Sequence, residues 1–96
     1  MLEELILISG KCMDRIAIVS IIVEQSSTDT IQKINDILHE FHDIILGRMG
    51  LPDKVHSVNI ISVAVCATES KINALTGKLG RVEGISAKTL YSKNTY

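Results

Sequence analysis

Four runs of the chain carry the hydrophobic pattern of β-strands. Residues 15–24 are an almost continuous series of isoleucine and valine without helical spacing, and such a run predicts a buried strand. Residues 44–49 form a shorter apolar segment, and residues 50–54, rich in turn-forming residues, predict a connection after it. Residues 57–67 form a longer apolar segment, and residues 85–92 have the two-residue alternation of a last strand. Because β-branched residues fit a pleated sheet, we expect a sheet to dominate the core.

Two other segments have the spacing of amphipathic helices. The first carries an apolar stripe at three- and four-residue steps, made of Ile31, Ile34, Ile37, Leu38 and Phe41. Ser27 or Thr28 can cap its start, since a side-chain oxygen there accepts a free backbone N–H. The second helix carries Ile72, Leu75 and Leu79 on one face. Thr68 is a suitable N-cap for it, and Gly80 is placed as the residue that follows its last turn.

The order of these elements is strand, helix, strand, strand, helix, strand. This order predicts an α+β, ferredoxin-like βαββαβ sandwich. Right-handed crossovers place the first and third strands in the centre of a four-stranded antiparallel sheet, with both helices on one face. We assign residues 13–92 to this domain, residues 1–12 to an N-terminal appendage and residues 93–96 to a frayed tail.

The two central strands are apolar on both of their faces. Ile16, Ile18 and Ile22 alternate with Ala17, Val19, Ile21 and Val23, and residues 58–66 repeat this pattern. In a sheet with helices on one face, the other face should be polar at every second residue. A large exposed apolar face is unusual in a monomer. We therefore expect a homo-oligomer, a dimer or a tetramer, formed through the open sheet face; the alternative is that residues 1–12 or the tail fold across it.

Composition narrows the class of protein. The 96 residues carry a net charge of −1 and a pI near 6.3, so no basic footprint suggests direct nucleic-acid binding by this chain alone. The first residues lack a basic leader, and their apolar run is too short for a signal core or a membrane span. Two cysteines, Cys12 and Cys66, form no CxxC pair. We expect a reduced, cytoplasmic protein that does not contact a membrane.

Metal and catalytic chemistry find little support in the residues. His39, His42 and His56 are candidate metal ligands together with the two cysteines. The helix is expected to end near Phe41, so His39 and His42 need not share a helix face. We therefore favour surface histidines and a buried Cys66 thiol over a metal site between subunits. The pair Gly77–Lys78 fails as a phosphate loop, because the required glycine and hydroxyl positions hold Ile72 and Leu79. No nucleophile, base and acid stand in a known catalytic pattern. We expect no enzyme activity.

Arg48 is the most promising binding residue. It lies on a short strand expected at the sheet edge, beside Gly47 and Gly50, where a backbone can approach a ligand closely. Its guanidinium fork suits a carboxylate. The alternative is an ordinary edge-strand charge that discourages pairing between sheets.

Four stretches resemble the family of iron-only hydrogenase system regulators. They are residues 35–38, residues 44–52, residues 72–80 and residues 84–88. The resemblance covers roughly residues 14 to 92 and implies an ACT-like domain, similar in fold to the C-terminal effector domain of nickel-responsive repressors. It also implies a ferredoxin-like fold and oligomerisation. Nickel ligation does not carry over, because the repressors' His and Cys pattern has no matching positions here.

We therefore predict an oligomeric regulatory or ligand-sensing module with a small-molecule effector, and the resemblance implies a transcriptional regulator linked to an iron-only hydrogenase system. The expected ligand-binding residues are Arg48, Gly50, Gly77, Lys78 and Gly80. One alternative is a metal-binding sensor that uses His39, His42, His56 and Cys66. Another is a structural interaction protein that docks on a hydrogenase-assembly partner.

Overall fold

The computed structural model describes residues 14–24 and 27–96. The predicted appendage over residues 1–12, with Cys12, lies outside the described residues. The elements in chain order are β1 (Arg15–Val23), α2 (Thr28–Glu40), the short 3₁₀ helix η2 (His42–Ile44), β2 (Ile45–Asp53), β3 (Val58–Ala67), α3 (Glu69–Gly80) and β4 (Ile85–Thr95). The βαββαβ order predicted from the sequence is confirmed.

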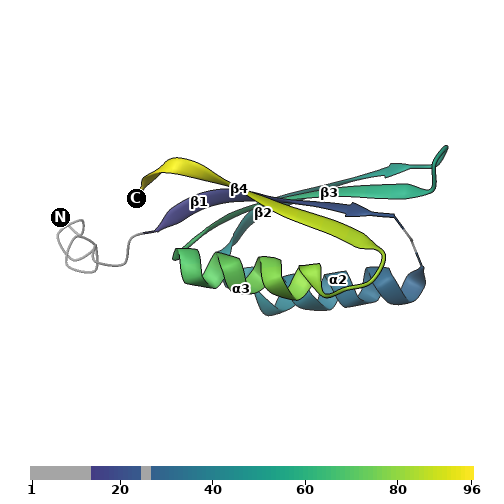
Figure 1. Ribbon diagram of the computed structural model, residues 1–96, viewed down its shortest axis with the longest axis horizontal. Coiled ribbons are helices and arrows are strands. Elements are labelled where there is room, and N and C mark those ends of the chain that lie inside the picture. The colour runs from purple at the N-terminus through teal and green to yellow at the C-terminus, as the bar shows by residue number, and fades with distance from the viewer. Residues whose placement is uncertain (1–13, 25–26) are drawn as a thin grey trace.

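The four strands form one antiparallel sheet in the order β2-β3-β1-β4. The first and third strands are central, as predicted, and β2 and β4 are the two edges. Both helices lie on one side of the sheet, and within residues 14–24 and 27–96 no helix covers the other side (Figure 1). The predicted ferredoxin-like α+β sandwich is therefore confirmed.

Side-chain caps fix the starts of both helices. The hydroxyl of Ser27 accepts a hydrogen bond from the backbone N–H of Thr30 at 3.0 Å, so Ser27 rather than Thr28 is the cap. Thr68 accepts from the backbone N–H of Lys71 at 3.3 Å, as predicted. Each cap satisfies a backbone donor that has no partner within its helix.

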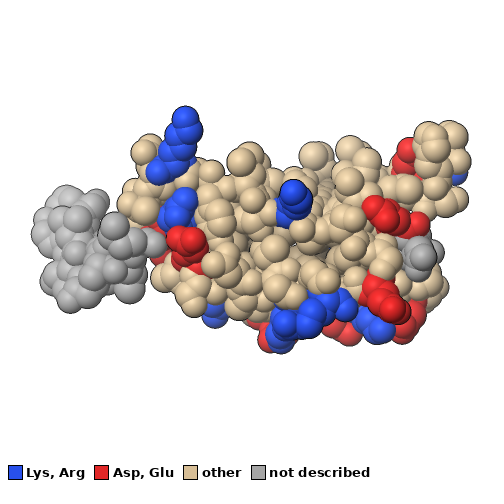
Figure 2. All heavy atoms as spheres, viewed as in Figure 1, with Lys and Arg blue, Asp and Glu red and all other residues tan. Residues whose placement is uncertain are grey.

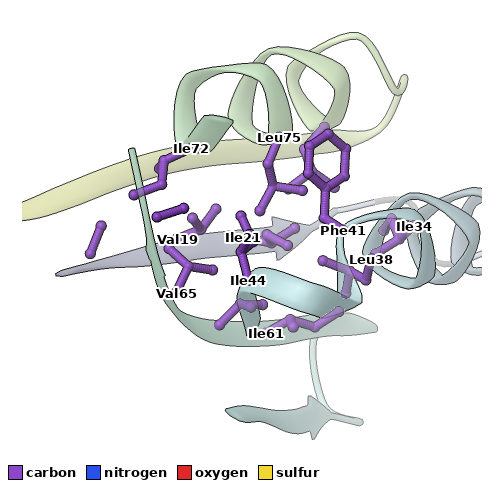
Figure 3. Packing of buried hydrophobic residues seen from close by; sticks show 14 of the residues in the cluster. Val19, Ile21, Ile34, Leu38, Phe41, Ile44, Ile61, Val65, Ile72 and Leu75 are labelled. Carbon is purple, nitrogen blue, oxygen red and sulfur yellow. The ribbon is translucent and has the colours of Figure 1, made fainter. Parts of the chain in front are cut away.

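The core lies between the sheet and the helices (Figure 3). Every second residue of β1 from Ala17 to Val23 is buried, and so is every second residue of β3 from Ile61 to Ala67. The helices add Ile34 and Leu38 from α2 and three residues from α3. Each large aliphatic side chain that is fully buried contributes about 1.5–3 kcal/mol, so this face of the sheet holds the fold together.

The second strand is longer than the sequence pattern indicates. We expected a connection over residues 50–54, but β2 continues through Asp53. Leu51 pairs with Ile60 and Pro52 with Asn59. Proline is tolerated there because β2 is an edge strand. Gly50 therefore lies within a strand and not in a loop, and the turn falls at residues 54–57.

Two predicted ends also need correction. Gly80 is the last residue of α3, and Arg81 is its C-cap with φ −91°, so Gly80 does not follow the helix; the left-handed glycine is Gly84, with φ 86°. The last strand continues to Thr95 instead of ending at Ser92. Backbone hydrogen bonds of 2.7 and 3.1 Å between Asp14 and Tyr96 secure this end of the chain against β1.

Candidate functional site: an open apolar sheet face and a groove beside Arg48

The sheet face that the helices leave uncovered is apolar across its four strands. Antiparallel pairing places Leu51, Ile60 and Ile22 in one row. A second row contains Ala64, Ile18 and Leu90. The large side chains of these rows are 42–70% exposed. We call this surface the open face, and the two-sided apolar pattern of the central strands is its origin.

Charge is sparse on the open face. The row between the two apolar ones holds Met49, Ser62, Ser20 and Lys88. In Figure 2 the middle of the sheet side is mostly uncharged, while charged residues gather on the helix side and at the ends. Cys66 pairs with Ile16 at one end of this face and is half-buried. The expected buried thiol is therefore only partly covered and is free.

A groove of about 310 Å³ lies between α2 and the edge strand β2. Ile31, Ile34 and Asn35 line it from α2, and β3 supplies residues 59–61. The β2 residues that line it are Arg48, Gly50, Leu51 and Pro52. We call it the α2–β2 groove, and its volume is at the lower end of the range of small-molecule sites.

Gly50 keeps this groove open. It pairs with Ile61, which is buried on the helix side of the sheet, so a side chain at position 50 would point toward the helices. A Cβ built there would meet no atom within 4 Å. The glycine thus leaves unfilled a space that a side chain of ordinary size would enter.

Arg48 points to the same side of the sheet. It pairs with Val63, which is fully buried under the helices, and its Nη2 donates a hydrogen bond to Asn35 Oδ1 at 3.2 Å. Across residues 14–24 and 27–96, Arg48 forms no ion pair. The guanidinium is therefore oriented by α2 and retains donors for a ligand.

A second, more open hollow of about 500 Å³ lies on the other side of Arg48 and Asn35. Asp36, Leu38, His39, His42 and Ile45 complete its lining. The rings of His39 and His42 are stacked with centroids 5.5 Å apart, and His42 Nδ1 lies 3.0 Å from the carbonyl oxygen of His39. Arg48 and Asn35 thus line both this hollow and the α2–β2 groove.

The candidate metal ligands do not converge. His56 is in the turn after β2, where its Nδ1 lies 2.8 Å from Asp53 Oδ2. This hydrogen bond lowers the pKa of Asp53, and backbone N–H donors of Val55 and His56 act in the same direction. In the part of the chain that the structure describes, no three His, Cys, Asp or Glu side chains form a metal-binding group.

The α3 residues expected in the ligand site lie elsewhere. Lys78 Nζ forms an ion pair with Glu40 Oε2 at 2.7 Å and lines a different hollow, beside Lys33 and Arg81. Gly77 and Gly80 are exposed, and a Cβ at either would meet nothing within 4 Å. The structure therefore brings Arg48 and Gly50 together and places Lys78 in another hollow.

Asn35 is the groove residue that sequence reasoning missed. It lies one turn after Ile31, at the border between the buried and exposed faces of α2. A polar amide at such a border is a signal for a hydrogen bond to a neighbouring element. Which element it meets depends on how α2 crosses the sheet, and the sequence pattern does not contain that information.

The architecture defines an ACT-like α+β domain. An ACT domain from a GTP pyrophosphokinase of Chlorobium tepidum matches with a TM-score of 0.67 and 18% identity, over 80% of this chain and 99% of that one. At this identity the likeness shows the fold alone. Among the described residues, no helix has the length and hydropathy to cross a membrane.

The particular family follows from residues 15–89. These residues match the family described as "TM1266-like: Iron-only hydrogenase system regulator, putative", and the chain belongs to this family. The structure of the uncharacterized protein TM1266 from Thermotoga maritima matches with 34% identity and a TM-score of 0.80, over 83% of this chain and 99% of that one. A search of curated proteins found no match.

Proposed function

We propose that this chain is a homo-oligomeric, non-catalytic regulatory module that binds a small effector in the α2–β2 groove. The observation that carries the assembly is the open face, where Ile18, Ile22 and Ile60 are each more than 40% exposed. The family description supports placing this regulation in an iron-only hydrogenase system. The groove and its oriented Arg48 support a binding role.

A second copy of the chain is the simplest cover for the open face. Two-fold pairing buries the same patch on both subunits. The row from Leu51 to Ile22 crosses β2, β3 and β1, and the row from Ala64 to Leu90 crosses β3, β1 and β4. A stable interface buries roughly 800 Å² on each partner. In the row between these two apolar rows the one charged side chain is Lys88, on the edge strand β4, so packing at the centre of the face takes few ions out of water.

The assembly is tested by sedimentation of the full chain and of a double variant, Ile18→Lys with Ile22→Lys. We expect the unaltered chain to sediment as a dimer or tetramer and the double variant as a folded monomer, with folding checked by circular dichroism. Val55→Lys is the matched control, because Val55 is 85% exposed in the turn after β2. A monomer for the unaltered chain at high concentration would overturn the proposed assembly.

The effector role is tested by thermal unfolding in the presence of amino acids, carboxylic acids and small inorganic anions. A compound that binds only the folded state raises the melting temperature. We expect at least one class of compound to do so, and we expect Arg48→Gln to abolish the shift. If no class raises the melting temperature, the sensing role is contradicted, whatever the oligomeric state.

A further inference from the structure

We propose that the α2–β2 groove binds a short aliphatic carboxylate that lacks an ammonium group. Its carboxylate contacts the guanidinium of Arg48, and its chain lies along the apolar lining of the groove. This inference rests on the proposed function in one respect, which is that the groove is the effector site. It adds the chemical class of the effector.

The anion-binding end of the groove is Arg48. A guanidinium has five N–H donors, and the structure shows one side-chain hydrogen bond from Arg48, to Asn35. Within residues 14–24 and 27–96 no carboxylate is paired with it. A carboxylate can therefore accept two parallel hydrogen bonds from the fork without displacing an internal partner. The hydrogen bond to Asn35, which also lines the groove, orients the fork.

Apart from Arg48 and the amides of Asn35 and Asn59, the lining of the groove is apolar, and it contains no acid. Ile31 and Ile34 line it from the helix, and Pro52 and Ile61 line it from the sheet. Arg48 is the single charged residue in the lining. An ammonium group placed there would lose its water without gaining an anionic partner, which is costly. The lining thus favours a simple fatty acid over an amino acid or an amine.

The charge arrangement also disfavours phosphate. Lys33, Lys78 and Arg81 line a different hollow, so one cation alone faces the α2–β2 groove. A monocarboxylate matches that single charge, while a phosphate dianion would remain partly uncompensated. The volume of about 310 Å³ suits a chain of a few carbons.

Titration calorimetry of the full chain with the straight-chain acids from propanoate to hexanoate tests the proposal. Burial of each added CH₂ should raise the affinity by about three- to fourfold until the groove is filled. 4-Methylpentanoate should bind more tightly than leucine, which carries the same side chain with an added ammonium group. Butylamine should not bind. A tighter complex with leucine would overturn the proposal, because it would show recognition of the ammonium group.

Two pairs of variants locate the site. Arg48→Gln should lower the hexanoate affinity at least tenfold, since a charge-assisted pair is lost, while Arg81→Gln on α3 should leave it unchanged. Gly50→Val should block the groove without disturbing the backbone, because a Cβ there meets nothing within 4 Å. Gly47→Val is its control, since Gly47 pairs with Ala64 on the open face. Equal hexanoate affinity for Arg48→Gln and the unaltered chain would exclude this site.

Sedimentation of the same samples separates the two proposals. If the chain is an oligomer and another class of compound raises its melting temperature while hexanoate does not bind, the carboxylate assignment fails and the regulatory module stands. If hexanoate binds a monomer with the expected variant pattern, the carboxylate site stands and the proposed assembly fails.

Discussion

Arg48 on the edge strand donates a hydrogen bond to Asn35 on α2 across a distance of 3.2 Å. This contact joins the edge strand β2 to α2, the helix that precedes it in the chain. It sets the direction of the guanidinium and separates the apolar α2–β2 groove from the hollow that contains His39 and His42. Asn35 is thus a positioning residue for Arg48.

Asn35→Ala should weaken hexanoate binding by less than tenfold. The guanidinium and its charge remain present, and only the solvent-exposed amide oxygen that fixes its direction is lost. Calorimetric titration alongside Arg48→Gln makes the comparison. A loss as large as that of Arg48→Gln would show that Asn35 contacts the ligand directly.

Lys78→Gln should leave the hexanoate affinity unchanged. Lys78 is paired with Glu40 and lines another hollow, so its removal does not alter the groove. The exposed ion pair should contribute only about 0.2–1 kcal/mol to the free energy of unfolding, measured by urea denaturation. A clear drop in affinity would return the α3 segment to the ligand site.

Leu75→Ala should destabilise the fold by about 2–5 kcal/mol, because the Leu75 side chain is fully buried and its removal leaves a cavity. Val55→Ala, in the exposed turn, should change the free energy of unfolding by less than about 0.5 kcal/mol. Urea denaturation at one fixed protein concentration compares the two. Equal effects would contradict the placement of Leu75 in the core.

Ser27→Ala should cost about 0.5–2 kcal/mol, because the backbone N–H of Thr30 loses its acceptor. Thr28→Ala is the matched control and should have little effect, since Thr28 already lies inside α2. Thermal unfolding of the two variants separates the two possible caps. A larger effect at Thr28 would contradict the observed start of the helix.

Asp53 should titrate below the ordinary pKa of an aspartate, which is about 3.9. The hydrogen bond with His56 is the largest cause, and it favours the ionised carboxylate. Because the pKa is lowered in the folded state, this contribution to stability is present above the unfolded-state pKa and is lost as the pH falls through the folded value. Carbon NMR of the side chain measures it, and His56→Ala should move the pKa upward. An ordinary value in the unaltered chain would contradict the contact.

Local patterns predicted most elements because they depend on local physics. The caps at Ser27 and Thr68 and the stripe from Ile31 to Phe41 reflect helical periodicity, which can be read within one segment. The predicted end of the second strand before Gly50 was wrong. Gly50 and Pro52 are residue types typical of turns, so the sequence pattern indicated a connection there. On an edge strand both residue types are compatible with pairing, and pairing with β3 extends β2 through these positions.

The α+β class, the element order and the two apolar sides of the central strands could all be predicted from the residues along the chain. Those features follow from periods of 2 and 3.6 residues, which each segment carries alone. The contact of Arg48 with Asn35, the place of Gly50 in the α2–β2 groove and the place of Lys78 in another hollow became visible only in the folded chain. These contacts depend on strand register and on the way the helices pack over the core, which are set by residues far apart in the chain.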